Sequence, residues 1–301
     1  MHEPESPALS VVVPSVNGLG DLLGCLEALA AEAARTPLEV LVVDRCGPAV
    51  RDHVRRQHSW VRIIEAPPGT PIPDLRAMAF AAARAPVVAV IEDHVLVPQG
   101  WAELLLAAQR RGESVVGGSV HNAATTRPVD WAAFLCEYSH LLPPLPAGPV
   151  PAITGNNTAY RRELLHRFQK VAASGRWEDH LHTVLRAHGV ELFYRPEITV
   201  AHKKHYTVGE YFSQRYLYGR SFAAGRLRNR LWLLRISYGL AAVLLPPILL
   251  VRIVRRVWPL PAYRGPLLRS LPLLPLFLVA GAAGEAIGAW LGPGDALSRV
   301  R

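Results

Sequence analysis

The chain of 301 residues has room for one large α/β domain and an appendage. Half of its residues are apolar and its mean hydropathy is +0.16, which is high for a wholly soluble protein and indicates contact with a membrane. The formal net charge of +9 comes almost entirely from arginine, and no zinc-finger, helix-turn-helix or RNA-recognition signature accompanies it, so no nucleic-acid partner is expected.

The three cysteines, Cys25, Cys46 and Cys136, lack the spacing of a metal site and are odd in number. Reduced thiols in a cytoplasmic protein are therefore expected. The first five residues carry neither a basic segment nor an apolar core, so the sequence predicts no signal peptide.

The chain opens with a strand, a helix and a second strand, over Leu9–Val13, Asp21–Ala34 and Leu38–Asp44. In such a βαβ unit the loops after both strands meet at one edge of the sheet, where a nucleotide base and ribose can be held. The residues expected there are Pro14, Ser15, Asn17 and Asp44. A dinucleotide-binding fold and a P-loop are disfavoured, because neither Gly-x-Gly-x-x-Gly nor a Walker lysine follows the first strand.

The central strand is predicted over Val87–Ile91, five consecutive apolar residues that are mostly β-branched. Glu92, Asp93 and His94 follow it directly. Two carboxylates and an imidazole suit a hard or borderline divalent cation, which could itself clamp a diphosphate. The alternative is a strand end followed by an ordinary polar turn.

Two later polar pairs each have a structural and a functional interpretation. Asn156 and Asn157 lie in a turn, where amides commonly satisfy backbone groups but could also line an acceptor pocket. Glu178 and Asp179 begin a predicted helix that ends at Gly189. Acids at that end offset the helix dipole, and one of them could instead act as a general base.

His202 follows two predicted strands, over 191–194 and 198–201. A histidine after a strand is commonly a surface residue, but at this position it could reach a metal or phosphates.

In the order and spacing of these motifs the chain resembles the family 2 glycosyltransferases, a large inverting family built on the GT-A fold. The resemblance extends from about Ser10 to Gly225. Four motifs carry it: the opening strand with Pro14 and Asn17; Val42–Asp44; Glu92–His94 with Pro98 and Trp101; and Trp177–Asp179 with Arg186, Gly189, Pro196 and His202.

The resemblance implies an α/β domain over residues 1–225, with an open, mixed and mainly parallel sheet flanked by helices. It implies a nucleotide-diphospho-sugar donor, a UDP-sugar as the first expectation, bound by Pro14, Ser15, Asn17, Asp44, Glu92 and Asp93. The family's Asp-x-Asp metal motif falls on Glu92, Asp93 and His94, and His202 is expected to join them around Mn²⁺ or Mg²⁺. Imidazole in place of the second acid remains a good Mn²⁺ ligand.

The family's catalytic acid falls on Asp179, beside Glu178. In an inverting transfer this carboxylate deprotonates the acceptor hydroxyl as it attacks the anomeric carbon. The segment Gln214–Arg220 is similar to the Gln/Arg-rich motif of processive members but lacks its closing Trp, so transfer of a single sugar is expected. The residues expected on the acceptor or phosphate side are Asn156, Asn157, Gln214, Arg215 and Arg220.

Residues 226–301 are expected to form a membrane-associated apolar helical hairpin, with apolar stretches over 236–251 and 270–294. Arginines flank the first stretch on both sides, which conflicts with the positive-inside rule for two spans. Two spans, an in-plane or re-entrant hairpin and a buried hairpin all remain open. The expected protein is a membrane-associated hexosyltransferase with a cytoplasmic catalytic domain and a lipid or lipid-linked acceptor.

Two other functions are compatible with parts of the sequence. The altered metal motif suggests a non-catalytic scaffold that binds a nucleotide-sugar or a lipid. A nucleotidyltransferase shares a similar sheet, but it should carry a glycine-rich loop with a basic residue after the first strand, and residues 14–18 show none.

Overall fold

The computed structural model describes residues 6–301, so the expectation of no signal peptide concerns residues outside the described part of the chain. The chain divides into two compact units. The first ends at Lys203 and excludes residues 122–142, and the second comprises Asn122–Leu142 and Lys204–Arg301. The functional boundary expected at residue 225 stays a prediction.

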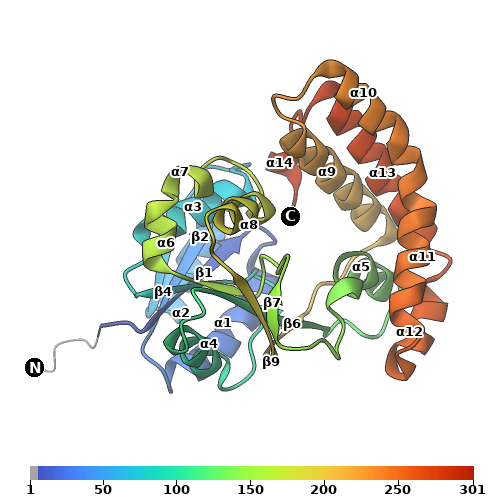
Figure 1. Ribbon diagram of the computed structural model, residues 1–301. Coiled ribbons are helices and arrows are strands. Elements are labelled where there is room, and N and C mark those ends of the chain that lie inside the picture. The colour runs from blue at the N-terminus through green and yellow to red at the C-terminus, as the bar shows by residue number, and fades with distance from the viewer. Residues whose placement is uncertain (1–5) are drawn as a thin grey trace, which may run out of the picture. The chain divides into compact units, whose positions relative to one another are not determined.

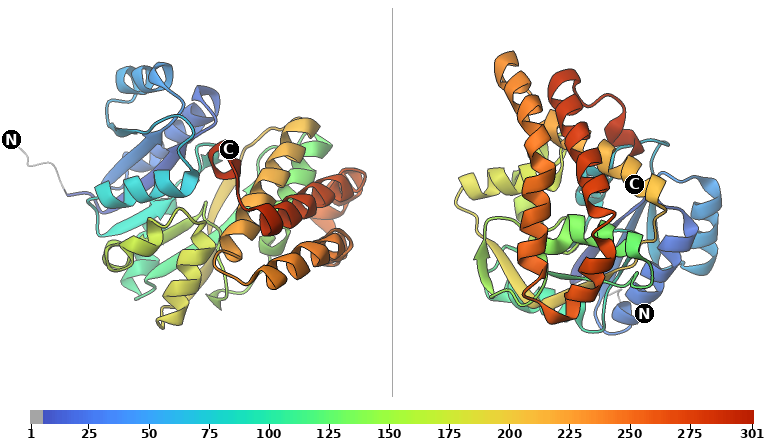
Figure 2. Two further views of the ribbon diagram at one scale, coloured as in Figure 1. Left: turned by 90° about the horizontal axis from the view of Figure 1, so that it is seen from above. Right: turned by 90° about the vertical axis from the view of Figure 1, so that its right-hand side faces the viewer.

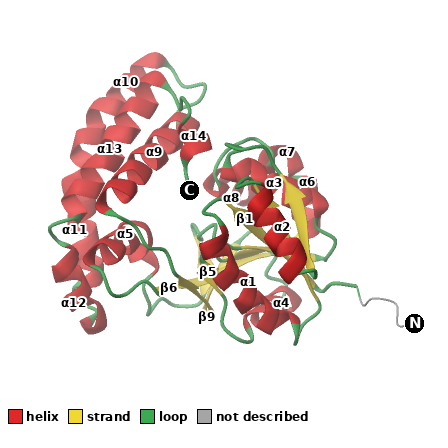
Figure 3. Ribbon diagram, turned by 180° about the vertical axis from the view of Figure 1, so that it is seen from behind, coloured by secondary structure: helices red, strands yellow, loops and turns green. Residues whose placement is uncertain are grey.

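The first unit is built on a nine-stranded sheet with the order β3-β2-β1-β4-β8-β6-β9-β5, and β7 pairs with β9 (Figures 1 and 3). The pairs β3–β2, β2–β1 and β1–β4 are parallel, and β8 joins β4 in antiparallel register. The strands are β1 (Leu9–Ser15), β2 (Leu38–Asp44), β3 (Val61–Glu65), β4 (Val87–Val90), β5 (Val95–Leu96), β6 (Val115–Asn122), β7 (Gly148–Val150), β8 (Thr158–Arg161) and β9 (Leu192–His202). The mixed α/β sheet expected from the sequence is confirmed.

Helices cover both faces of this sheet. The helices are α1 (Leu19–Ala33), α2 (Pro48–Gln57), α3 (Ile72–Ala82), α4 (Trp101–Arg110), α6 (Arg162–Arg167), α7 (Gln169–Ala172) and α8 (Glu178–Ala187). Figures 1 and 3 show α1 and α4 on one face and α3, α6 and α8 on the other. Each of the first two parallel strands is followed by a helix. This helix returns the chain to the end of the sheet where the strands begin, as the βαβ pattern predicts.

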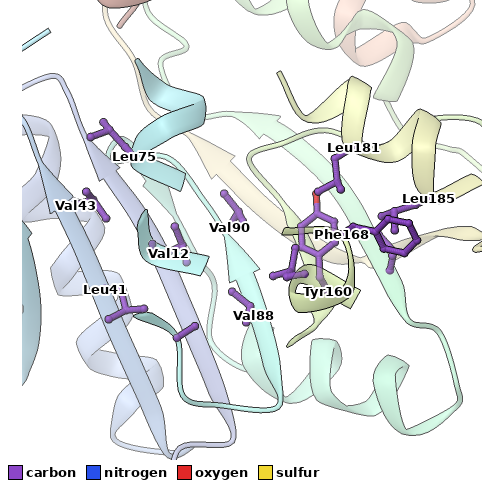
Figure 4. Packing of buried hydrophobic residues seen from close by; sticks show 14 of the residues in the cluster. Val12, Leu41, Val43, Leu75, Val88, Val90, Tyr160, Phe168, Leu181 and Leu185 are labelled. Carbon is purple, nitrogen blue, oxygen red and sulfur yellow. The ribbon is translucent and has the colours of Figure 1, made fainter. Parts of the chain in front are cut away.

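The core of the first unit lies between the sheet and the helices α3, α6 and α8 (Figure 4). Val12, Leu41 and Val88 come from three neighbouring parallel strands and are fully buried. Leu75 of α3 and Leu185 of α8 are buried with them in one cluster. Burying each such side chain stabilises the fold by about 1.5–3 kcal/mol, which fixes the strand ends that carry the polar residues.

The two strands expected over 191–194 and 198–201 form one strand, β9. Pro196 suggested a break because it has no backbone N–H to donate. It lies between the segment that pairs with β7 and the segment that pairs with β5, so neither of these ladders needs its N–H.

The second unit is helical. Its elements are α5 (Pro128–Tyr138), η1 (Ser139–Leu141), α9 (Val208–Arg226), α10 (Trp232–Ala241), η2 (Ala242–Leu244), α11 (Leu245–Val257), α12 (Pro261–Ser270), α13 (Leu274–Leu291) and α14 (Ala296–Arg299). Helix α13 packs against α9 on one side and against α10 and α11 on the other (Figures 1 and 2).

Both expected apolar stretches are helical. Residues 232–257 and 274–291 are long and apolar enough to cross a membrane, judged by length and composition. The first helical stretch extends beyond the expected 236–251 at both ends. The chain stays helical through Pro246 and Pro247 because they stand in the first turn of α11, where a missing N–H costs little.

Candidate active site

Three side chains from two strand ends converge into a candidate metal centre. Glu92 and His94 follow β4, and His202 ends β9. The Nε2 atom of His94 lies 2.9 Å from Nε2 of His202 and 3.3 Å from Oε2 of Glu92. Adjacent ligand atoms around an ion with bonds of about 2.1 Å are separated by about 3 Å, so this cluster fits one divalent cation.

The pairing of β5 with β9 explains why the two histidines meet. Val95 pairs with His202, and the backbone N–H of Lys203 donates to the carbonyl of His94 at 3.0 Å. The expectation that His202 can reach the residues after the central strand agrees with this register.

Opposite charges are balanced within the candidate metal centre. Burial alone would lower the pKa of His94, but its hydrogen bonds with Asp93 and Glu92 outweigh burial and raise this pKa to about 9. Burial alone would raise the pKa of Glu92, but the hydrogen bond and charge of His94 outweigh it and lower this pKa to about 2. The carboxylates thus favour a positive charge at His94, and because imidazole binds a metal in its neutral form, an ion bound here would displace this proton.

Asp93 lies outside this cluster, although the sequence placed it among the metal ligands. Its Oδ2 accepts from the backbone N–H groups of Val16 and Asn17, both at 2.8 Å, and its Oδ1 accepts from the Asn17 side chain at 2.7 Å. Asp93 therefore fixes the loop after β1, and Asn17 is held beside His94, with Nδ2 at 3.3 Å from Nδ1.

Asp44 is also fully buried and organises a neighbouring turn. It accepts from the Ser15 hydroxyl at 2.9 Å and from the backbone N–H groups of Cys46 and Gly47 at 3.2 and 3.0 Å. Arg51 pairs with it at 3.2 Å. Pro14, expected in a loop, lies within β1 opposite Val43, because the strand extends to Ser15. The donor-binding roles expected of Pro14, Ser15, Asn17 and Asp44 stay predictions.

Arg76 is a central residue of the site that the sequence analysis missed. Its buried guanidinium donates from Nη1 to Oε2 of Glu178 at 2.5 Å, and its Nη2 lies 3.8 Å from Oε1 of Glu92. It thereby links the candidate metal centre to the start of α8. A signal was present, because Arg76 occupies an inward position of the helical series formed with Ile72, Leu75 and Ala79.

The two acids at the start of α8 have different surroundings. Glu178 is partly buried and paired with Arg76, and a Cβ atom at Gly155 would lie only 2.2 Å from its Oε1. Asp179, the next residue, is exposed. Glu178 is thus held in place by the protein, whereas Asp179 is accessible from solvent.

The two adjacent amides also differ. Asn156 donates from Nδ2 to Oε2 of Glu92 at 3.3 Å and so belongs to the site. Asn157 is fully buried: its Oδ1 accepts from Nε1 of Trp101 at 3.1 Å, and its Nδ2 donates to the carbonyls of Ser119 and Ile198 at 3.0 and 2.9 Å. The donors and acceptor of Asn157 thus hold the strands together, and its expected role in an acceptor pocket stays a prediction.

The other residues expected on the acceptor side lie in the helical unit. Gln214 accepts from the backbone N–H of Arg301 at 2.8 Å, and Arg220 donates from Nε to the carbonyl of Gly292 at 3.1 Å. Arg215 lies beside α13, where a Cβ atom at Gly281 would be 3.1 Å from its Nη2. These contacts fasten α9 to α13 and to the C-terminal segment, and the acceptor roles stay predictions.

Comparison with known proteins gives one family and several related structures. The family model described as glycosyl transferase family 2 matches residues 10–168. No curated protein matches the sequence. The mannosyltransferase PcManGT from Pyrobaculum calidifontis, solved with GDP-Man and Mn²⁺, is similar with a TM-score of 0.55 and 17% identity, over 94% of this chain and 88% of that one.

Two further structures have the same fold at lower coverage. S. aureus TarS, residues 1–349, has a TM-score of 0.50 and 15% identity over 74% of this chain, which spans 66% of the TarS chain. GalNAc-T7, solved with UDP, GalNAc and Mn²⁺, has a TM-score of 0.51 and 15% identity over 67% of this chain, which spans 45% of that chain. These likenesses confirm the expected sheet and its flanking helices.

Proposed function

Because the chain belongs to glycosyltransferase family 2 and has the GT-A fold, we propose that it is a metal-dependent, inverting glycosyltransferase that uses a nucleotide-diphospho-sugar donor. The convergence of Glu92, His94 and His202 at the end of the central strand is the observation that carries this proposal. It lies at the edge where ligands bind in open α/β sheets.

We propose that Glu92, His94 and His202 hold Mn²⁺ or Mg²⁺, with Mn²⁺ favoured by the two imidazoles. Two of the similar structures were solved with Mn²⁺ and a nucleotide or nucleotide-sugar, which supports this choice. A bound ion would neutralise charge on the departing diphosphate. Asn156 orients the carboxylate of Glu92 for this task, and Asp93 holds the loop after β1, which together with Asp44 is proposed to receive the nucleotide.

Asp179 is proposed as the general base that removes the proton of the acceptor hydroxyl. Its exposure leaves it accessible to an acceptor, whereas Glu178 is paired with Arg76. Proton transfer to a carboxylate on the side opposite the leaving diphosphate is the requirement of an inverting displacement. Glu178 acts beside it by keeping Arg76 and the start of α8 fixed.

The acceptor is proposed to be a membrane lipid or a lipid-linked glycan, with a UDP-sugar as the first donor to test and transfer of a single sugar. Two helical stretches of membrane-compatible length and the arginines beside them support membrane association. Confinement of acceptor and enzyme to one surface raises the effective concentration of the acceptor. The catalytic domain, proposed to comprise residues 1–225, is assigned to the cytoplasmic side.

A donor panel tests these assignments. Full-length protein is stripped of metal with a chelator and then supplied with Mn²⁺ or Mg²⁺, UDP- or GDP-sugars, and either membrane lipid or a water-soluble alcohol. Mass detection of the product is expected to show metal-dependent transfer, to lipid in preference to the soluble alcohol, and NMR of the product is expected to show inversion at the anomeric carbon. Donor binding without transfer or hydrolysis would instead identify a scaffold, and equal rates with soluble and lipid acceptors would refute the lipid acceptor.

A further inference from the structure

Helices α10 and α11 expose large apolar side chains, here called the α10–α11 face, which include Trp232, Leu240, Val243, Leu244, Val251 and Trp258. Only 17% of the most apolar window of residues 232–257 is buried, and Val243 and Leu240 are 74% and 62% exposed. No charged residue interrupts the sequence from Ile236 to Val251. Large exposed apolar surfaces of this kind mark sites that bind a membrane or a partner.

Helix α13 has a different environment, because it is the core helix of the unit. Half of its apolar window is buried, and α9 lies along it (Figure 2). The two backbones approach so closely that a Cβ atom at Gly284 would lie 2.1 Å from the carbonyl oxygen of Tyr216, and one at Gly288 would lie 2.2 Å from that of Arg220. Any environment that surrounds α13 must therefore accommodate α9 as well.

Helix α9 is too polar for the hydrocarbon core of a bilayer. It carries Glu210, Gln214, Arg215, Arg220 and Arg226. Charged side chains within a bilayer are strongly disfavoured, and here they occur along the helix that is packed against α13. If α13 crossed the membrane, α9 would have to enter it too, so the packing argues against a pair of spans.

The arginines around α10 and α11 also indicate that both ends of the apolar helix lie on the same side of the membrane. From Arg226 to Ser270 the sequence has nine arginines and no acidic residue. Arg228 precedes the apolar helix, Arg255 and Arg256 lie in its last turn, and these three are exposed. A helix that lies flat in the interface lets both groups meet anionic headgroups of one leaflet, and it places Trp232 and Trp258 at the level of the headgroups.

We propose that the helical unit is a monotopic membrane-binding module: the α10–α11 face lies in the plane of one anionic leaflet, α13 lies behind it, and α9 stays in water. This rests on the membrane association included in the proposed function and specifies its geometry. Both ends of the α10–α11 helix then remain on the side of the membrane that carries the catalytic domain.

Labelling of introduced cysteines from either side of a bacterial inner membrane tests the geometry. The parent variant is Cys46→Ser, which removes the exposed cysteine and measures background labelling of the others. Arg228→Cys and Gly265→Cys then flank the α10–α11 helix, and a Cβ atom at Gly265 meets nothing within 4 Å. Val243→Cys lies on the face itself.

A membrane-impermeant maleimide is expected to label both flanking cysteines in inverted vesicles and neither in spheroplasts. Val243→Cys should be protected in membranes. In protein extracted with an amphipathic polymer, this cysteine is labelled only if the polymer leaves the α10–α11 face open. Detergent solution with a membrane-permeant maleimide therefore serves as the positive control for labelling of Val243→Cys. Labelling of the two flanking sites from opposite sides would overturn the proposal in favour of spans. Recovery of the protein in the soluble fraction would overturn it in favour of a soluble hairpin.

Flotation with liposomes tests the headgroup preference. Binding is expected to be at least tenfold stronger to vesicles of phosphatidylcholine with phosphatidylglycerol than to phosphatidylcholine alone, and each of Arg255→Gln and Arg256→Gln should weaken it about fivefold. Equal binding to both vesicles would overturn the role of the arginines. Transfer by the same variants to a soluble acceptor in detergent is measured in parallel, so loss of membrane binding with retained transfer separates failure of this inference from failure of the proposed function.

Discussion

Replacing Arg76 by methionine removes a guanidinium that contacts the carboxylates of both Glu178 and Glu92. The guanidinium is buried, and the two acids keep 21% and 27% of their side-chain exposure. Breaking a buried ion pair costs about 3–5 kcal/mol, and this partial exposure places the expected loss in stability of the first unit at about 3 kcal/mol.

Hydrogen exchange followed by mass spectrometry measures this loss within the full chain. Peptides from β4 and α8 that exchange through unfolding of the first unit should exchange about 10²-fold faster in Arg76→Met, because about 1.4 kcal/mol corresponds to a factor of ten. Peptides of α13 report on the second unit and should be unchanged.

Two further variants separate charge from packing. Adding Glu178→Gln to Arg76→Met removes one of the carboxylates that lost its partner, so it should recover part of the protection. Arg55→Met breaks a surface pair with Glu65, in which both side chains are more than half exposed, and should change nothing measurable. If Arg76→Met is as mild as Arg55→Met, or if the second substitution makes it worse, the ion-pair account of the site is refuted.

Four other substitutions have definite expected outcomes. Asp179→Asn should lower kcat by about 10²–10⁴-fold, the usual contribution of a general base, with donor affinity by calorimetry nearly unchanged. His94→Ala should weaken Mn²⁺-dependent binding of the nucleotide-sugar far more than binding of the free nucleoside. Glu113→Gln should destabilise the protein at neutral pH but match wild type in strong acid. Gly284→Ala should destabilise the helical unit by about 1–3 kcal/mol, whereas Gly265→Ala, with open space around it, should not destabilise it.

The pH dependence of the Glu113 variant follows from its ion pairs. Burial alone would raise the pKa of Glu113, but hydrogen bonds from Arg195 and Arg111 outweigh it and lower this pKa below the ordinary value of 4.5. A lowered pKa in the folded state stabilises the protein above the ordinary value, and this stabilisation is lost as the pH falls through the lowered one. Urea midpoints of wild type and Glu113→Gln from neutral to acidic pH should therefore converge, and a constant difference would contradict this reasoning.

The remaining three predictions each have an outcome that would contradict them. Equal loss of donor binding in Asp179→Asn would assign that residue to the donor. Activity indifferent to chelator would exclude the metal role of His94. Equal melting temperatures for Gly284→Ala and Gly265→Ala would show that the two helices separate easily enough to admit a methyl group.

The central part of the site was predictable from the sequence because it follows strand ends. The apolar run before Glu92 and His94 has the period of a buried strand, and His202 comes at the end of another one, so parallel and antiparallel pairing alone bring them to one edge. The family resemblance supplied the order of these motifs, and the family match over residues 10–168 agrees with it.

The roles of Asn157 and Asp93 could not be predicted in the same way. The partners of Asn157 come from α4, β6 and β9, and those of Asp93 come from the loop after β1. Such contacts depend on tertiary packing between residues far apart in sequence, which no local pattern encodes. Arg76 is an intermediate case. The helical pattern of the sequence predicts its inward position on α3, but it does not predict its two carboxylate partners.

The strand order of the sheet has a consequence for synthesis of the protein. β8 lies between β4 and β6, and β9 follows β6, so the sheet has all its strands only when the chain has been made as far as His202. The apolar helices begin at Trp232, which is later in the chain. Since chains are made from the N-terminus and domains fold as units, every strand of the sheet is synthesised before the apolar helices emerge from the ribosome. The strands can therefore pair before the segments most prone to aggregate are exposed.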